Sequence, residues 1–378
     1  MKKRSIATLL IAALILAALS AGCSGTDPQS AQTGASPMEP DNHLMPSAAS
    51  PNAGQEGQTY FFTDFTGREV ELPANIERII PAGPLAQIVL FTLVPDKLVG
   101  LASALTGDQL QYMDDRFRSL PEIGHFSAGT FNLESVMVAA PQVIIDIGQA
   151  SPGLADDMQS IQERTGIPTV FVQLDDIETM LTGYATLGGL LGASKQADRI
   201  ISYISENILS VIERAEAIPD SQKARVYFGQ NDGLTAMIAN SIHSDVIDFA
   251  GGRNVADVEQ TVRGGAAEIS MEQLILWNPD IILFASGSIY DTVASLNEWS
   301  ALRAVREGSY YEIPQGPYNW LGRPPSVNRL LGIRWLASLF HPEIFPFDMA
   351  QETREFYKLF YHWDLTDEQI GELLSRTT

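Results

Sequence analysis

Two stretches of the chain repeat one pattern, FNLESVMVAAPQVII at residues 131–145 and ISMEQLILWNPDIIL at residues 269–283. The second residue of each, Asn132 or Ser270, is polar and can cap a helix, and a glutamate follows two positions later, Glu134 or Glu272. A short apolar helix, a proline and an apolar strand complete the pattern. The repeat therefore predicts two related halves, each built from alternating helices and strands.

Short apolar runs bounded by turn residues recur before and after a long helical stretch at residues 176–217. The first set lies at residues 77–80, 98–101, 142–145 and 168–172, and the second at 224–228, 280–284 and 310–313. Strands that alternate with helices indicate mostly parallel sheets covered on both faces. We predict an α/β fold of two Rossmann-like lobes joined by a long backbone helix, with a ligand cleft between them. Gly188, Gly189 and Gly192 weaken the middle of that helix, so a turn there is an alternative.

The amino terminus has the three parts of a secretory signal: a basic start, an apolar run at residues 6–19, and small residues before Cys23. Residues 20–23, Ser-Ala-Gly-Cys, resemble the bacterial lipobox, which implies that Cys23 is lipidated and anchors the protein to the cell membrane. A bystander cysteine within an ordinary signal is the alternative. The expected organisation is a signal peptide at 1–22, lipidated Cys23 and a flexible tether at 23–58, an N-terminal lobe at 59–175, a connecting helix at 176–218, a C-terminal lobe at 219–345, and C-terminal helices packed on the lobes at 346–378.

Composition excludes several classes of protein. The chain has a formal net charge of −22, which argues against a nucleic-acid binder because such proteins need basic patches. It contains no Gly-x-Gly-x-x-Gly, P-loop or His-Glu-x-x-His motif, and the nearest match to a hydrolase elbow, residues 125–129, lacks the first glycine. We therefore expect no catalytic residues and no cofactor, with a hydrolase kept as a remote alternative.

The repeated pattern resembles that of the solute-binding proteins of ABC importers for ferric siderophores, haem and vitamin B12. The resemblance also rests on residues 65–73, 78–81, 96–100 and 248–255, in that order along the chain. It implies an extracytoplasmic binding protein, expected to be a monomer, in which Glu134 and Glu272 dock onto arginine pockets of a permease dimer. The alternative for both glutamates is that they only complement the amino termini of their helices.

Ligands of open α/β sheets bind beyond the carboxyl ends of the strands. The loop at residues 316–326 gets the most weight, because it places two aromatic side chains and a cation after a strand. In the alternative, Trp320 packs under this loop and Arg323 pairs with a surface acid. The candidate ligand-binding residues are Pro84, Ser103, Phe126, Phe131, Gln230, Asn231, Arg263, Tyr318, Trp320 and Arg323.

Arginines facing a cleft favour an anionic ligand, such as an iron chelate with free carboxylates, or a related haem or corrinoid. A bare metal ion is disfavoured and no metal ligands are assigned, since the five histidines are scattered along the chain. A molybdate- or tungstate-binding protein of the same fold is the main alternative, and it requires a smaller pocket with backbone donors. A surface adhesin without transport is a third, in which the two glutamates would serve no partner.

Overall fold

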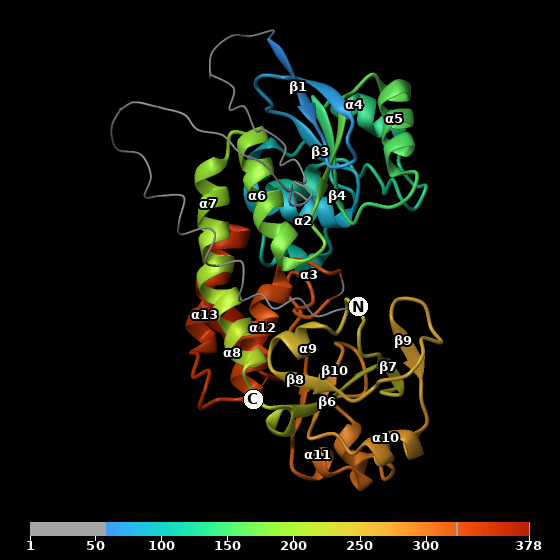
Figure 1. The fold of residues 1–378 in the computed structure, drawn as a ribbon, viewed down its shortest axis with the longest axis vertical. Coiled ribbons are helices and arrows are strands. Elements are labelled where there is room, and N and C mark those ends of the chain that lie inside the picture. The colour runs from blue at the N-terminus through green and yellow to red at the C-terminus, as the bar shows by residue number, and fades with distance from the viewer. Residues whose placement is uncertain (1–57, 323, 378) are drawn as a thin grey trace, which may run out of the picture. The chain divides into compact units, whose positions relative to one another are not determined.

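The structure is a computed structural model, which describes residues 58–322 and 324–377 of the chain (Figure 1). The first lobe is built on a three-stranded parallel sheet in the order β3-β4-β5. The hairpin of β1 and β2 is tied to this sheet, because the Phe171 amide donates to Asp64 Oδ2 over 3.3 Å. The strands are β1 (Thr59–Thr63), β2 (Glu69–Pro73), β3 (Ile79–Pro81), β4 (Val143–Gly148) and β5 (Thr169–Gln173).

Helices on both sides of the first sheet bury its apolar strands. Residues 86–93 of α2 are all buried, as expected for a helix that is apolar all round and packs against β3 and β4. Figure 1 shows α5 and α6 on opposite sides of this sheet, and both contact β5. The helical segments of this lobe are α2 (Pro84–Leu93), η2 (Pro95–Lys97), α3 (Gly107–Leu110), η3 (Asp115–Ser119), α4 (Leu133–Ala139) and α5 (Leu154–Thr165).

The second lobe contains a six-stranded sheet in the order β11-β10-β6-β7-β9, with β8 paired to β6. Strands β11, β10, β6 and β8 are parallel, whereas β7 and β9 are antiparallel, so the predicted α/β fold with mostly parallel sheets is confirmed. The strands are β6 (Ala224–Gln230), β7 (Thr235–Met237), β8 (Gly252–Asn254), β9 (Ala266–Glu268), β10 (Ile281–Phe284) and β11 (Tyr310–Glu312). The helical segments are η5 (Asp220–Gln222), α9 (Val246–Phe249), α10 (Met271–Trp277), η6 (Val293–Ser295), η7 (Trp299–Ala301), α11 (Arg303–Arg306) and α12 (Asn328–Phe340).

One predicted strand is absent from the described residues. The apolar run at residues 98–101 forms only single bridges, from Leu98 to Ile79 and from Leu101 to Glu122. Its two ends bridge to different segments, so no continuous ladder of hydrogen bonds can form along it. The run still fills the first core, because Leu98 and Leu101 are buried.

The connection between the lobes contains two helices rather than one. The chain turns at residues 191–193, and the helix before the turn packs beside the helix after it (Figure 1). Glycine permits this packing, since a Cβ on Gly188 would lie 2.5 Å from the Ala197 Cβ, and Gly192 makes the turn with a φ of +65°. The long connecting helix is therefore residues 194–216. The segments are α6 (Ile177–Leu190), α7 (Ser194–Tyr203), the π-helical η4 (Ile204–Leu209) and α8 (Ser210–Glu216).

The C-terminal segment forms hydrogen bonds with both lobes. Gln369 Nε2 donates to the Gln111 carbonyl of the first lobe over 2.9 Å, and Arg376 Nη1 donates to Glu312 Oε2 of the second over 2.6 Å. Gln196 of α7 joins the same segment to α2, because its Nε2 donates to the carbonyls of Leu359 and Thr92. The segment consists of α13 (Met349–Phe356), the π-helical η8 (Tyr357–Tyr361) and α14 (Asp367–Leu374).

Candidate functional site

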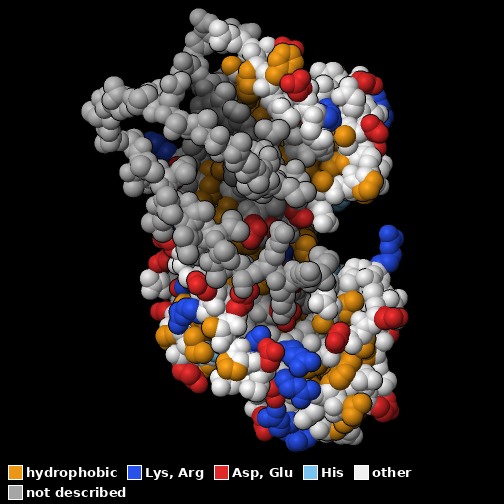
Figure 2. Space-filling model, viewed as in Figure 1, with side chains coloured by type: hydrophobic (Ala, Val, Ile, Leu, Met, Phe, Trp, Pro, Cys, Tyr) orange, Lys and Arg blue, Asp and Glu red, His pale blue; other side chains and the backbone are white. Residues whose placement is uncertain are grey.

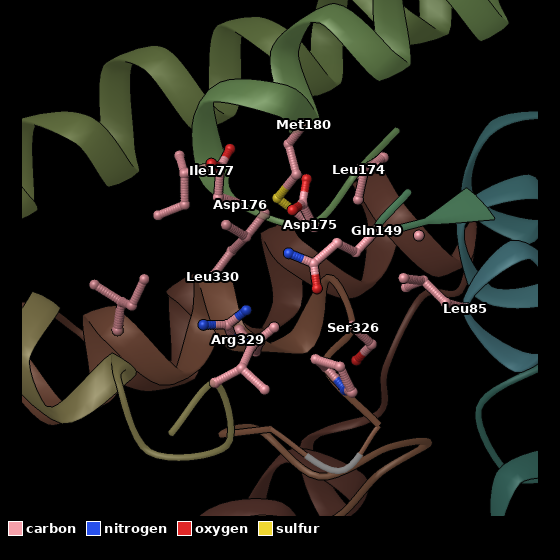
Figure 3. A pocket seen from close by; sticks show the side chains of 14 residues that line it. Leu85, Gln149, Leu174, Asp175, Asp176, Ile177, Met180, Ser326, Arg329 and Leu330 are labelled. Atoms are coloured by element: carbon pink, nitrogen blue, oxygen red, sulfur yellow. The ribbon is translucent and has the colours of Figure 1, made fainter. Parts of the chain in front are cut away.

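A cavity of about 370 Å³ lies where the chain leaves β4 and β5, opposite α12 (Figure 3). The carboxyl ends of parallel strands are where α/β folds place their ligands. In Figure 3, Leu85 reaches the cavity from α2, Met180 from α6, and Leu330 from α12. The apolar side chains of the wall are those of Leu85, Leu174, Ile177, Met180, Ile242, Pro325, Leu330 and Ile333.

Among the described residues, three charged side chains line this cavity, and each is held by a defined contact. Asp176 caps α6 by accepting the Thr179 amide over 2.7 Å, and Asp175 accepts Gln173 Nε2 over 3.0 Å. Arg329 forms an ion pair with Asp245, and its Nε has no hydrogen-bond partner among the described residues. Burial raises the pKa of Asp245, and the Arg329 charge opposes that shift without cancelling it. The cavity therefore combines an apolar wall with one cation and two carboxylates.

Asp146 stands close to this cavity, two residues before the lining residue Gly148 in β4. Burial raises the pKa of its carboxyl to about 6, although the Ile147 amide donates to Oδ1 over 3.0 Å and opposes the shift. Among the described residues no cation pairs with Asp146. The carboxyl is therefore partly protonated near neutral pH.

A second pocket of about 210 Å³ lies at the carboxyl ends of β6 and β10. It adjoins the first, because Ile242 lines one and the next residue, His243, lines the other. Its described lining carries amides and hydroxyls and no carboxylate, and its polar members are Gln230, Asn231, His243, Ser286, Gln315 and Asn319. Such a wall can donate several hydrogen bonds to a ligand.

Ser103 and Tyr318, two of the predicted ligand-binding residues, are linked through Gln87. Gln87 Nε2 donates to the Ser103 carbonyl over 3.2 Å, and Gln87 Oε1 accepts from the Ser103 amide over 2.9 Å. Ser103 Oγ contacts His125 Nε2 at 2.5 Å. Burial raises the pKa of the Tyr318 hydroxyl well above its usual value, and a hydrogen bond with Gln87 opposes that shift. A polar chain thus runs from the loop after β11 to the His125 loop of the first lobe.

Four other predicted ligand-binding residues are dispersed, three in the first lobe and one in the second. Pro84 begins α2 and only its neighbour Leu85 lines the larger cavity. Phe126 and Phe131 make an edge-to-face contact of 6.4 Å and pack on the core of the first lobe. Arg263 is exposed in the turn that precedes β9.

Trp320 requires a correction. Its side chain is fully buried and packs against Trp335 with ring centroids 6.4 Å apart, so the structure does not present it to a ligand. The alternative in which Trp320 packs under its loop is the observed arrangement. Arg323 lies outside the described residues, as do Cys23, the predicted signal peptide, and the tether up to residue 57.

The structure also adds site residues that the sequence reasoning missed, namely Asp175, Asp176, Met180 and Arg329. The rule of strand carboxyl ends could have pointed to Asp175 and Asp176, since they follow β5 directly. Met180 and Arg329 lie within helices, where an apolar or cationic residue carries no signal of facing a cavity.

Glu134 and Glu272, the predicted docking residues, occupy the same place in α4 and α10, and both are exposed. The Glu272 pKa is lowered by the backbone amide at its own position and by the Ser270 side chain. Among the described residues neither glutamate has an ion-pair partner.

The sequence model of the family described as periplasmic binding protein matches residues 86–317, which include α4, α10 and most of the residues that line both pockets. The chain belongs to this family. Its members serve transport as solute-binding proteins and are not enzymes, so the family predicted from the repeat is confirmed. The protein is thus an extracytoplasmic substrate-binding component of an ABC transporter, with a small-molecule ligand and a permease partner.

The names of the similar proteins state different ligands or none. A solved ABC transporter solute binding protein from Sulfurospirillum deleyianum is 28% identical, with a TM-score of 0.75 over 83% of this chain and 99% of that one. The molybdate-binding protein MolA of Haemophilus influenzae is 20% identical over 79% of this chain and 90% of that protein. A cobalamin-binding protein of Halobacterium salinarum is 25% identical over 58% of this chain and 57% of that protein.

Within residues 58–322 and 324–377, no helix has the length and apolar character needed to cross a membrane. No group of three or more His, Cys, Asp and Glu side chains in the same residues is placed to hold a metal ion.

Proposed function

We propose that this protein captures an iron complex of the siderophore type, or a related metal chelate such as a corrinoid or haem, for delivery to an ABC importer. The observation that carries the proposal is the larger cavity, with a volume of about 370 Å³ and an apolar wall beside a few charged groups. Pockets for organic ligands measure about 300–1,000 Å³ and have mostly apolar walls. A bare oxyanion has no apolar surface for such a wall to cover.

Arg329 is the cation best placed to meet an acidic chelate. It lines the cavity, and its guanidinium, which is paired with Asp245, can also attract a ligand carboxylate. Acidic side chains are scattered over the face shown in Figure 2, so the net charge of −22 is not concentrated at one place on that face. Local charge decides binding, and in the cavity the Asp175 and Asp176 carboxylates oppose the attraction of Arg329 for an anionic chelate.

Native mass spectrometry of the protein from its own cells, combined with a metal scan, tests the proposal directly. We expect iron or cobalt together with an organic mass. Molybdenum or tungsten without an organic mass would overturn it. Titration of the purified protein with a ferric hydroxamate chelate, haemin, cyanocobalamin and sodium molybdate, followed by tryptophan fluorescence, then ranks the ligands.

Asp176→Asn sharpens this experiment, because asparagine preserves the helix cap while removing one charge from the cavity. We expect a ferric chelate with free carboxylates to bind roughly two- to fivefold more tightly, since one nearby negative charge is lost. Neutral cyanocobalamin should bind unchanged in the same titration. Weaker binding of the anionic chelate would contradict the placement of its carboxylates near Arg329.

The second candidate function is oxyanion binding in the smaller pocket. It is favoured by the amide and hydroxyl wall, with no carboxylate among the described lining residues, and by the molybdate-binding relative. Asn231→Asp separates the two candidates, because aspartate tolerates the φ of 53° at this position and places a negative charge in the pocket. If the oxyanion is the ligand, molybdate binding is lost in this variant, whereas a chelate in the larger cavity keeps its affinity.

We further propose that the protein is a monomeric lipoprotein anchored through Cys23, and that Glu134 and Glu272 dock on the permease dimer. Cys23→Ser should move the protein from the membrane fraction to the soluble fraction of fractionated cells. Glu134→Lys combined with Glu272→Lys should abolish uptake while the purified protein still binds its ligand. Uptake that survives this double charge reversal would show that Glu134 and Glu272 are not required for docking.

A further inference from the structure

Exposed large apolar side chains are few among the described residues, and most belong to the two repeated helices. Four of the six lie at matching positions of α4 and α10, three and four residues after each glutamate. In both helices the second member of the pair is the more exposed, at 78% for Val138 and 77% for Leu276. The two apolar pairs are Met137 with Val138, and Ile275 with Leu276.

Each helix is fixed at its carboxyl end by the same device, an arginine that donates to the last carbonyls. Arg78 Nε donates to the Ala140 carbonyl over 3.0 Å and Nη2 bonds the Ala139 carbonyl. Arg225 Nη1 donates to the Asn278 carbonyl over 3.4 Å and Nη2 bonds the Trp277 carbonyl. We call these two side chains the arginine clamps.

The clamps are themselves held by matching partners. The amide of Arg78 donates to Gln142 Oε1 and that of Arg225 to Asp280 Oδ2, each over 2.9 Å. Both helices end in a left-handed residue, Ala140 with a φ of 45° or Asn278 with a φ of 44°. The repeat therefore sets the orientation of each helix on its lobe by the same set of bonds.

The inward sides of the helices are satisfied by their own lobes, with Val136 and Ala139 buried in one and Leu274 in the other. The apolar pairs point away from these cores and have no described cover. An exposed apolar pair that recurs at the same place on two helices, each held by the same bonds, is typical of a binding surface.

We propose that the two apolar pairs are the main contacts with the permease, one pair for each of two equivalent apolar sockets on a permease dimer. This rests on the proposed function. Two observations favour this occupant. Matching motifs in the two lobes suit a partner that presents the same surface twice, and the adjacent exposed Glu134 and Glu272 suit basic groups beside each socket.

The apolar pairs and the glutamates have different tasks in this complex. Exposed ion pairs contribute little to affinity and mainly steer the encounter, whereas apolar side chains that enter a pocket dominate the free energy of binding. The glutamates thus set orientation and association rate, and the apolar pairs set the dissociation rate.

The test measures binding of this protein to the cognate permease dimer, purified with its ATPase subunits and reconstituted in lipid nanodiscs, by surface plasmon resonance. Val138→Ser and Leu276→Ser should each weaken binding about tenfold, and the double variant about a hundredfold, through faster dissociation. Phe61→Ser is the matched control, since Phe61 is 70% exposed on β1 and has no counterpart in the repeat. It should bind as the unmodified protein does.

The possible outcomes distinguish a failure of this inference from a failure of the proposed function on which it rests. If the unmodified protein does not bind the nanodiscs, the proposed function fails. If the unmodified protein binds, and the double variant of Val138→Ser and Leu276→Ser binds as tightly as the Phe61→Ser control, the inference is overturned while the proposed function stands. Circular dichroism and thermal unfolding of each variant check that the fold is retained, as expected for substitutions at exposed positions.

Discussion

The helix and strand at residues 132–145 and those at 270–283 are alike up to the middle of each strand and differ beyond it. Caps, left-handed ends and arginine clamps repeat, and Ile144 of β4 matches Ile282 of β10. Two residues later, the first strand carries Asp146 and the second carries the fully buried Phe284. The comparison separates two tasks: the repeated part mounts surface helices, and the divergent strand ends shape two unlike pockets.

The largest effect is expected from breaking the matched strands themselves. Ile144→Ala and Ile282→Ala each remove a fully buried side chain from a central strand, which should cost about 2–5 kcal/mol of unfolding free energy. Because hydrogen bonds of the C-terminal segment join the lobes, both variants should lower one shared transition in differential scanning calorimetry.

Val138→Ala serves as the control for this pair, because the side chain is exposed and its loss should change stability by less than about 0.5 kcal/mol. Two separate transitions, each moved by only one of the isoleucine variants, would show that the lobes unfold independently. The similarity of the two halves would then extend to thermodynamics as well as to structure.

Asp146 offers the next test, at the point where the two strands diverge. Burial raises its folded-state pKa to about 6 from an ordinary value near 4, so folding favours the protonated form. Its contribution to stability is fully present below pH 4 and is lost as the pH rises through 6. Asp146→Asn avoids that loss and should be about 1–3 kcal/mol more stable than the unmodified protein at pH 7, with no gain at pH 4.

Urea unfolding at pH 4, 5, 6 and 7 measures this difference. Asp198→Asn is the control, since Asp198 is exposed on α7 and should show no such trend. A constant difference between Asp146→Asn and the unmodified protein across these pH values would mean that burial does not perturb this carboxyl.

Sequence reasoning succeeded where an apolar run is bounded by a residue that ends a helix, such as proline. The proline and apolar run in each repeat predicted β4 and β10, and the strand-end rule led to Gln230 and Asn231, which line a pocket. It failed for Trp320, because a single sequence cannot tell which side of a loop its aromatic residue faces. It also failed for Arg329, since a cation in an apolar helix looks like any surface residue until the helix is placed across the cavity from the residues that follow β5.

A smaller effect is expected at the arginine clamps. Arg78→Ala and Arg225→Ala each remove charge-assisted bonds to helix carbonyls, at a cost of about 1–2 kcal/mol. The loss should be the greater for Arg78, whose Nε lies 3.0 Å from its carbonyl, compared with 3.4 Å for Arg225 Nη1. Hydrogen exchange should accelerate in α4 for the first variant and in α10 for the second.

Arg78→Lys and Arg225→Lys keep the positive charge but lose the forked guanidinium donors, so each should recover only part of the stability that the alanine variant loses. Arg118→Ala gives the baseline, because its pair with Asp115 is exposed at both ends. Acceleration spread over a whole lobe, rather than confined to one helix, would assign the clamps a general structural role.

The smallest effect is expected at the helix caps, where the two halves use different residues for one purpose. Asn132 accepts the Ser135 amide over 3.1 Å and Ser270 accepts the Gln273 amide over 3.2 Å, so replacing either cap with alanine should cost about 1 kcal/mol. Exchanging the caps, as Asn132→Ser and Ser270→Asn, should be nearly neutral in urea unfolding. Ser270→Ala should also raise the Glu272 pKa toward its ordinary value in an NMR titration, because the Ser270 side chain helps to lower it. If exchanging the caps costs as much stability as replacing them with alanine, Asn132 and Ser270 are not interchangeable, and each helix requires its own capping residue.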